Sequence, residues 1–596
     1  MKKRNKVLSL MLAALLTAGS FATLTGCNVA PPVVEGPQNS AQEEIDNKRT
    51  QLYVRNYQGG FGNQWLYNAK AKFESKYEGV SLEPDKEGVQ VIIHDKKETP
   101  QVTLIPSDIY EVYFVEKLSY LTMTPTESSS GVLEDITDIV TQANPYDEKT
   151  IESKLTEEQR AFYGIKEGTE TKYYALPHYV ASAGIVYDKK MFGDRKFYFK
   201  KGYETETELD MKFIEFSDDE RSAGPDGEEG TDDDGLPATY EDFWDLCEWI
   251  KRDGKTPLNW GGTGSMQFYV TALMIQLMAD YQGKDQFMMN FTFDGMMNDM
   301  AKLDKDGEMI FDENGDPVTE SVTLDPAKNN GYETYRNVSY YHALRFVKKL
   351  AETIGTYSIK SLVTSKTYDA FAAQDDYVSS KFKADETGPN ADLATLDQAM
   401  LIEGSWWDRE ASAYFTANKT IYGEQASKEN SNYGWLPLPK ATRAQVEKKV
   451  KNTMVNTIDS LCFVKPGLSQ TKKDLSFDFV RLLHSDESLV DFTLETNAFK
   501  DFQYDLQPTQ VATLSNFGKE MYGFWKSWDV ITPHDNNAQY LDTLYAVSSA
   551  RRYGRNDTDT FPGMVFASEA GKDISAADYL ADSYRYVKSS NGIWNQ

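Results

Sequence analysis

The fold is decided by the stretch Leu52-Tyr53-Val54-Arg55-Asn56-Tyr57-Gln58-Gly59-Gly60-Phe61-Gly62, an apolar strand pattern that ends in a glycine-rich loop. Further strands are predicted at 89–93 and 109–115, where short apolar runs recur. Strands that alternate with helices, with glycine at the strand exits, predict an α/β fold with doubly wound sheets. Between the first two strands a helix is predicted, because aromatic or small apolar residues recur every four positions: Trp65, Ala69, Phe73 and Tyr77.

The chain of 596 residues is too long for one ordinary hydrophobic core. We therefore expect two or more lobes after about Gln51. Cysteine is rare. Cys247 lies on the apolar face of a predicted helix and Cys462 in a strand-like run, so both are expected to be buried free thiols. A disulfide between them is permitted in an oxidising compartment, but the spacing does not predict it.

The first 26 residues have the pattern of a secretory signal peptide. A basic start is followed by the apolar run 7–16 and by small residues at 18–22. The run is shorter than the roughly 20 apolar residues that span a bilayer. It ends in Leu24-Thr25-Gly26-Cys27, which resembles a bacterial lipobox, so Cys27 is expected to carry a lipid. The alternative is an ordinary export signal in which Cys27 is incidental. Residues 27–50 are expected to form a flexible tether.

The net charge of −29 limits the partners of this protein. The signal peptide carries four cations and no acids, so the exported part is more negative still. Such a surface argues against nucleic acid and against anionic lipid headgroups as partners. The chain also lacks a Walker A motif, and its glycine-rich loop does not have the dinucleotide-binding spacing. The composition fits a neutral ligand, or simply an extracellular protein that its charge keeps soluble.

Short segments in order along the chain carry a more specific signal. They are Gly131–Asp138, Tyr174–Pro177, Gly184–Asp188, Pro237–Phe243, Lys255–Trp260, Ile402–Trp406, Asn432–Pro439, Phe477–Asp486 and Asp573–Tyr579. Together they resemble bacterial extracellular solute-binding protein family 1, the maltose-binding-protein-like lipoproteins of carbohydrate ABC importers. The resemblance covers nearly the whole exported chain.

This resemblance implies a two-lobe, periplasmic-binding-protein-like fold of type II, in which a hinge joins two doubly wound lobes. The first lobe would contain 51–180 with about 460–515. The second would contain 183–455 with about 530–596. The hinge would consist of crossover segments, which are expected near 178–185, 455–463 and 515–530.

Two insertions interrupt the family pattern. The first, 195–236, contains Asp226, Asp233 and Asp234 among several glycines. One interpretation is a structural Ca²⁺ site, and the alternative is a solvated acidic loop, because the spacing differs from that of an EF-hand. The second, 303–325, is predicted to be a β-hairpin rather than a metal loop. No other cofactor is expected.

Sugars present hydroxyl groups at the ring edge and apolar C–H faces, so their sites combine aromatic rings with carboxylates and amides. Trp406 is the leading stacking candidate, because it matches a stacking tryptophan of the family. Glu403 is a nearby hydroxyl acceptor. Of the substrate-binding candidates Trp406 and Trp407, one ring is expected in the cleft and one in the core. Trp406 is favoured for the cleft, and the reverse assignment stays open. Trp260 follows a strand-like run and should face the cleft, with a core role as the alternative.

The remaining substrate-binding candidates follow from the family's strand ends and crossovers. For Glu116, at the third strand's end, helix capping is the alternative. At the first crossover Ala181 stands where the maltose protein has a carboxylate, so maltose itself is in doubt. The candidates are Tyr57, Gln58, Gly60, Phe61, Glu116, His178, Tyr179, Trp525 and Trp528.

The resemblance implies a function in carbohydrate import rather than catalysis. The protein would be lipid-anchored at the extracytoplasmic face of the cell membrane, would capture an oligosaccharide between its lobes, and would deliver it to the transmembrane subunits of an ABC permease. One alternative is a cell-surface glycoside hydrolase or lyase, which needs two carboxylates about 5–10 Å apart. The other is a binding protein for a non-sugar solute such as a peptide.

Overall fold

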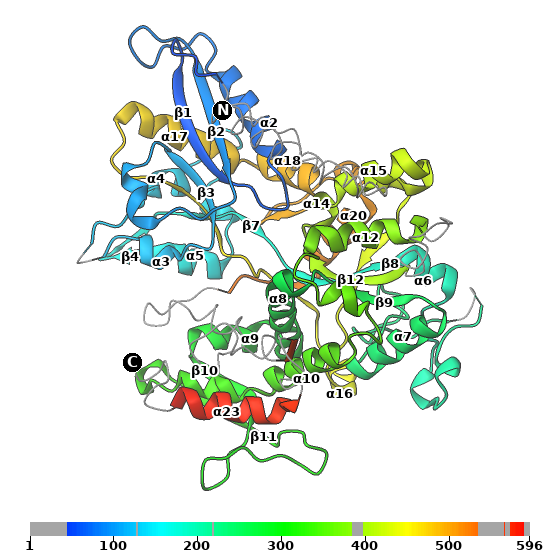
Figure 1. Cartoon of the computed structure of the whole chain (residues 1–596). Helices are drawn as coiled ribbons and strands as arrows, with labels where there is room; N and C mark the ends of the chain where they lie inside the picture. Colours follow the sequence, from blue (N-terminus) through cyan, green and yellow to red (C-terminus); the bar gives the residue numbers. More distant parts are fainter. Residues whose placement is uncertain are drawn as a thin grey trace, which may run out of the picture.

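The computed structural model describes residues 44–126, 129–216, 220–383, 397–533, 565–566 and 573–588. Two separate sheets, each covered by helices, form two lobes that lie one above the other in Figure 1. The predicted two-lobe α/β class is therefore confirmed. The predicted signal peptide and Cys27 lie outside the described residues. None of the helices in the described part of the chain is long and apolar enough to cross a membrane.

The sheet of the first lobe has five strands, ordered β2-β1-β3-β15-β6. The first three are parallel, and β15 runs antiparallel to β3. Their bounds are β1 (Thr50–Tyr57), β2 (Val89–Lys96), β3 (Val112–Glu116), β15 (Ser460–Val464) and β6 (Leu176–Pro177). Helix α2 (Gln64–Lys76) buries Trp65, Ala69 and Phe73, the face that the sequence period predicts. It packs against α17 (Gln470–Leu483) and α18 (Asp486–Thr496).

Two predicted boundaries in this lobe are wrong. Strand β3 begins at Val112 rather than at 109, and Ile109 is 55% exposed in the preceding turn. The last residues of the predicted tether are also part of the fold. The backbone N–H of Asp46 donates to Gln90 Oε1 (2.9 Å), and the N–H of Glu87 donates to the carbonyl of Lys48 (2.8 Å). These bonds hold residues 46–49 against β2, and β1 already begins at Thr50.

The sheet of the second lobe has four strands, ordered β13-β8-β12-β9, and all four are buried. Their bounds are β13 (Tyr433–Trp435), β8 (Ala183–Asp188), β12 (Gln398–Gly404) and β9 (Thr256–Asn259). Helix α7 (Tyr240–Arg252) begins with a capping box between Thr239 and Asp242. Its buried residues Phe243, Leu246, Cys247 and Ile250 follow the helical period. The other main helices are α8 (Thr263–Gln282), α9 (Lys284–Thr292), α10 (Val338–Glu352), α12 (Ala370–Lys383), α14 (Trp407–Glu410) and α15 (Ser412–Tyr422).

The two lobes are joined by short strands that pair with one another. Strand β7 (Tyr179–Val180) pairs with β16 (Phe499–Lys500), and β14 (Thr453–Val455) pairs with β17 (Asp529–Ile531). Asn456 connects these segments. Its side chain accepts from the N–H of Ala181 (3.0 Å) and donates to the carbonyl of Tyr179 (3.0 Å). Its backbone N–H donates to the carbonyl of Ile531 (2.8 Å). Helix α20 (Asn516–Ser527) then packs on β13.

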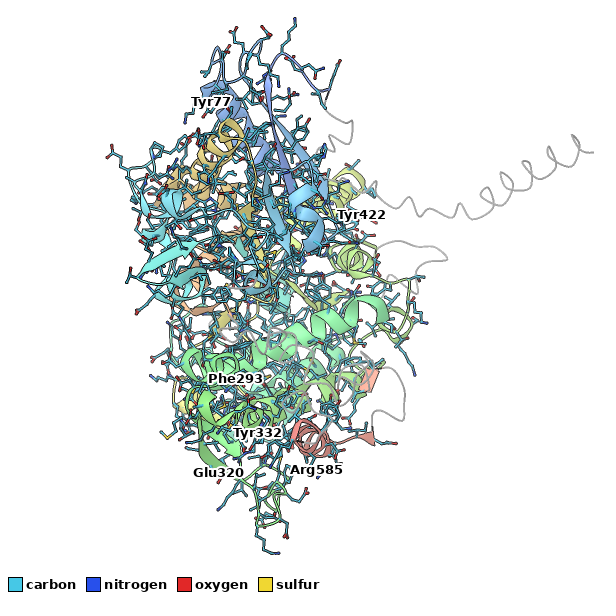
Figure 2. All side chains as sticks on the ribbon, turned by 90° about the vertical axis from the view of Figure 1, so that its left-hand side faces the viewer. Tyr77, Phe293, Glu320, Tyr332, Tyr422 and Arg585 are labelled. Carbon is cyan, nitrogen blue, oxygen red and sulfur yellow. The ribbon has the colours of Figure 1, made fainter. Side chains whose placement is uncertain are left out.

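The second insertion lies in a hairpin, as predicted. Strands β10 (Gly295–Ala301) and β11 (Thr319–Leu324) are antiparallel, and bridges at Leu303–Met309 and Phe311–Pro317 continue the pairing between them. Helix α23 (Ala576–Lys588) covers the base of this region. Figure 2 shows Phe293, Tyr332 and Arg585 together at this end of the molecule, where Arg585 pairs with Glu308 (2.6 Å).

Both cysteines of the described chain are buried and unpaired, as predicted. Cys247 lies in α7 of the second lobe and Cys462 in β15 of the first. The Cys247–Cys462 disulfide, which an oxidising compartment would permit, is therefore absent.

Candidate functional site

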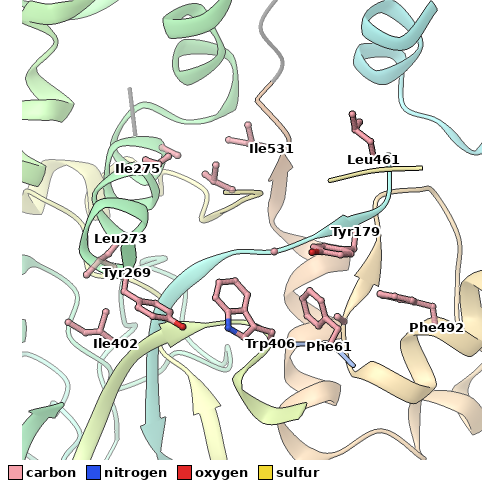
Figure 3. Packing of buried hydrophobic residues seen from close by; sticks show 14 of the residues in the cluster. Phe61, Tyr179, Tyr269, Leu273, Ile275, Ile402, Trp406, Leu461, Phe492 and Ile531 are labelled. Atoms are coloured by element: carbon pink, nitrogen blue, oxygen red, sulfur yellow. The ribbon is translucent and has the colours of Figure 1, made fainter. Parts of the chain in front are cut away.

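The two lobes meet at a cluster of rings, which we call the interlobe cluster. It consists of Phe61 and Tyr179 from the first lobe and Tyr269 and Trp406 from the second (Figure 3). Phe61 packs edge-on against Tyr179 (centroids 4.8 Å apart) and Trp406 (6.3 Å). Tyr269 lies on the other side of Trp406 (6.1 Å). Trp406 is only 6% exposed, because both lobes cover it.

Glycine is required at two positions that touch Trp406. A Cβ at Gly60, in the loop after β1, would lie 2.5 Å from Trp406 Cδ1. A Cβ at Gly404, the last residue of β12, would lie 2.2 Å from Trp406 Cζ2. Real Cβ contacts are longer than this, so only glycine lets both backbones approach the ring. The cluster forms where β1, β3 and β12 end, the edge at which α/β sheets bind ligands.

Glu116, the last residue of β3, is 5% exposed and lies beside the Gly59–Gly60 loop. It accepts a hydrogen bond from the hydroxyl of Tyr179. Burial raises the pKa of Glu116, and the Tyr179 bond partly offsets that shift. Burial and the nearby Glu116 also raise the pKa of Tyr57. The carboxyl is therefore bonded to a ring of the cluster and does not cap a helix.

A pair of carboxyl groups, Glu403 and Glu410, lies behind Trp406. The amide nitrogen of Gln374 donates to Glu403 Oε2 (3.2 Å) and to Glu410 Oε2 (2.7 Å). Glu403 also accepts from the N–H of Gly404 (2.8 Å). Burial, and then repulsion from Glu410, raises the pKa of Glu403 to about 8. Gln374 Oε1 is buried without a hydrogen-bond partner in the described structure, so this network has an unused acceptor.

The rim of the cluster has two exposed rings from the second lobe. Phe268 of α8 is 40% exposed and lies 6.2 Å from Trp406. Phe371 of α12 is 41% exposed, and Lys97, in the loop after β2, lies over its face (5.8 Å). Lys97 also lowers the pKa of Glu410, which burial raises. Phe268 thus extends the ring cluster toward solvent, and Lys97 of the first lobe lies near Glu410 of the second.

The structure brings together six of the predicted substrate-binding residues. They are Tyr57, Gly60, Phe61, Glu116, Tyr179 and Trp406, with Glu403 directly behind Trp406. Gln58 is half-buried in the same loop, where its N–H donates to the carbonyl of Lys96 (3.0 Å). Trp407 is fully buried among Tyr377, Tyr433 and Phe517 in the core of the second lobe, the position expected for the inward ring of the pair.

Two predicted site residues lie in the core instead. Trp260 is 1% exposed and contacts Phe566 (6.5 Å), so it does not face a cleft, and the core alternative describes it correctly. His178 is 3% exposed and packs on Trp65 and Phe114. Its Nδ1 lies 2.6 Å from Nζ of the buried Lys500, and burial and that cation keep its pKa well below the usual range. Neither side chain is available to a ligand in this conformation.

Trp525 and Trp528 belong to a different region. They lie at the end of α20, where Trp525 stacks on Phe499 (4.7 Å) and Trp528 on Phe524 (4.2 Å). Both line a cavity that shares no residue with the interlobe cluster. Their position at the third crossing is as expected, but the structure does not place them beside Trp406.

Tyr269, Gln374 and Glu410 were not predicted. Tyr269 and Gln374 lie inside helices whose apolar patterns mark them as ordinary helix residues, and Glu410 is seven positions after Glu403. Only the fold brings α8, α12 and α14 to one point. No local pattern in the sequence marks these three residues as parts of one site.

The acidic loop of the first insertion uses its carboxyl groups internally. Asp233 accepts from the N–H of Asp226 (3.1 Å) and from Thr231 (2.5 Å), and Asp234 accepts from the N–H of Gly230 (2.8 Å). Burial and the neighbouring acids raise the pKa of Asp233 to about 7. Within the described ranges, no three Asp, Glu, His or Cys side chains gather in a geometry that fits a metal ion. Calcium binding here stays a prediction.

Comparison with known proteins gives structural neighbours only. No protein-family model and no curated protein matches the sequence. The chain is similar to a chitin oligosaccharide binding protein (14% identity, 90% of this chain and 98% of the other, TM-score 0.49). It is also similar to the Thermus thermophilus maltotriose binding protein (15% identity over 90% of this chain and 99% of the other, TM-score 0.44). A third structural neighbour is a family 1 extracellular solute-binding protein from Bifidobacterium longum subsp. infantis (13% identity over 90% of this chain and 99% of the other, TM-score 0.42). Sequence identities and TM-scores this low assign no ligand to this chain.

The raised pKa of Glu403 predicts a pH-dependent stability. A carboxyl group whose pKa is higher in the folded state favours the folded state at low pH, and this contribution is lost as the pH rises through the folded pKa. Between about pH 5 and pH 8 the wild-type protein should lose stability relative to Glu403→Gln, which carries no titratable group there. Urea denaturation of both proteins across this range measures the difference. Parallel pH profiles would contradict the assignment.

Proposed function

We propose that this protein is the substrate-binding component of a carbohydrate ABC importer and that it captures an oligosaccharide between its two lobes. The observation that carries the proposal is the position of Trp406, at a strand end of one lobe and against Gly60 and Phe61 of the other. Glu116 and Glu403 lie next to this ring. An aromatic face with adjacent carboxyl groups is the combination that binds sugars.

The mechanism follows from the hinge. When the lobes separate at the crossover strands, the Phe61 and Gly60 side of Trp406 becomes accessible, and a sugar ring can stack there. Each good stack contributes about 1–1.5 kcal/mol beyond the area that it buries. The carboxyl groups accept bonds from sugar hydroxyls, and closure removes the complex from water. Binding and release involve no covalent change.

The proposal extends to the membrane. The lipobox-like sequence before Cys27 supports a lipid anchor, and an anchored binding protein on the extracytoplasmic face requires permease subunits as partners. The ordered segments that resemble solute-binding protein family 1 support the same assignment. An enzyme of the glycoside hydrolase or lyase type would instead release products from the sugar, which a turnover assay detects.

Replacement of Trp406 tests the site directly. Trp406→Ala should weaken oligosaccharide binding by about 2 kcal/mol or more, because a central aromatic contact is lost. Titration calorimetry against a panel of oligosaccharides measures this effect. Trp407→Ala is the matched control. It should destabilise the fold by roughly 3–5 kcal/mol, because it leaves a cavity in the core. Unchanged affinity in Trp406→Ala would place the sugar elsewhere.

Closure on ligand should be visible in solution. Because the described conformation already packs the lobes together, the ligand-free protein should sample wider conformations, and a saturating oligosaccharide should lower its radius of gyration. Small-angle X-ray scattering with and without sugar measures this change. Identical profiles, with binding shown by calorimetry, would mean a permanently closed protein.

The anchor is tested in cells. Cys27→Ala removes the only residue of the lipobox-like sequence that can carry the lipid, so the exported protein should leave the membrane fraction. Fractionation followed by immunoblotting measures its distribution, and Cys247→Ala is a control that leaves the sequence around Cys27 intact. A Cys27→Ala protein that stays with the membrane would contradict the anchor.

A further inference from the structure

A cavity of about 970 Å³ lies at the hinge, apart from the interlobe cluster. The first lobe contributes α5 (Glu157–Tyr163) and residues 501–507, and the second contributes the start of α9. Residues of 149–156, the start of α18, the end of α20 and all of β17 also line it. In Figure 1, α5 and α9 lie on the left of the view, whereas α12 and α14, which carry Gln374 and Glu410, lie on the right. The cavity and the cluster therefore lie on opposite sides of the hinge.

The charged groups of this cavity balance one another. Lys284 of the second lobe pairs with Glu158 of the first (2.9 Å). Lys149 pairs with Asp486 (2.6 Å), and Lys526 with Asp505 (2.6 Å). Because these cations already have carboxylate partners, the cavity offers little net charge to a strongly anionic or cationic ligand. Its chemistry favours a neutral occupant.

Aromatic rings and hydrogen-bonding groups complete the lining. Trp528 is half-buried and stacks on Phe524. Trp525 and Tyr504 also line the cavity, and their ring centroids are 5.0 Å apart. Asp501 is buried and accepts from the hydroxyl of Thr532 (2.8 Å), and Gln503 adds an exposed amide. Rings together with carboxyl and amide groups bind apolar C–H faces and hydroxyls at the same time.

We propose that this hinge-side cavity is a second saccharide-binding site, with Trp528 as its stacking ring and Asp501 and Gln503 as hydroxyl partners. Only the ligand class is shared with the proposed function, since no residue of the interlobe cluster takes part. The site accounts for the two tryptophans that the cluster leaves unused. A cavity of this volume can enclose a ligand of several sugar rings, since ligand pockets commonly measure about 300–1,000 Å³.

The test is titration calorimetry of the full exported protein with maltotriose, raffinose and chitotriose, each as a separate probe. A saccharide that binds should occupy two sites per protein. Trp528→Ala should remove one site or weaken it by about tenfold or more, the size of one stacking contact. Trp528→Phe keeps an aromatic ring at this position and should therefore retain most of the affinity of the second site. Trp249→Ala is the matched control, because that half-buried ring also stacks on a single phenylalanine, Phe213.

The outcomes separate the two proposals. A single site that is lost in Trp406→Ala and unchanged in Trp528→Ala overturns the hinge-side site and leaves the proposed function intact. A single site that is lost only in Trp528→Ala supports the hinge-side site and overturns the interlobe one. No binding of any of the three probes contradicts both. Melting temperatures of the variants close to that of Trp249→Ala exclude unfolding as the cause.

Discussion

The structure depends on the hydrogen bonds that Asn456 makes with the crossover segments. Its amide oxygen accepts from Ala181, its amide nitrogen donates to Tyr179, and its own N–H donates to Ile531. Asn456 is 4% exposed, so water does not compete for these bonds. Three segments that are far apart in sequence therefore behave as one narrow connection. Strand β8 of the second sheet and β15 of the first begin a few residues beyond these segments, so each lobe is attached directly to this connection.

Buried ionisable groups surround this connection. Lys500 is enclosed by Trp65, Phe114 and Phe492 and faces His178, and burial lowers its pKa to about 7. Asp459 is half-buried, and desolvation of its carboxyl group raises its pKa to about 7. Cation–π contact with three rings is what makes a lysine tolerable here.

Much of the fold could be predicted from the sequence, because local patterns specify it. The period of Trp65, Ala69 and Phe73 identified α2, and the apolar run before Gly59 identified β1. Turn residues identified the hairpin at 303–325. The predicted start of β3 was wrong, because Ile109 has a side chain typical of strands but lies in the segment before the strand. The prediction that residues 46–49 belong to a flexible tether was wrong, because backbone hydrogen bonds that the composition does not reveal hold this polar segment.

The site was predictable only where a strand end specified it. Glu116 is the last residue of β3 and Trp406 lies two residues after β12, so their positions come with the sheets. Gln374 and Glu410 meet only because α12 and α14 pack behind β12, a tertiary arrangement that no local period contains. Trp260 also follows a strand, but it is buried against Phe566. A strand end thus gives the edge of the sheet on which a residue lies but not whether another element covers it.

The position of the crossovers between the cluster and the hinge-side cavity has a mechanical consequence. Two packed lobes move as rigid bodies, because close-packed interiors do not deform continuously. A rotation about the crossovers that separates Gly60 from Trp406 must bring α5 toward α9 on the other side. The Lys284–Glu158 pair spans that side and already lies at bonding distance. We infer that opening of the cluster would narrow the cavity, so that the volume available there would depend on how far the lobes have closed around Trp406.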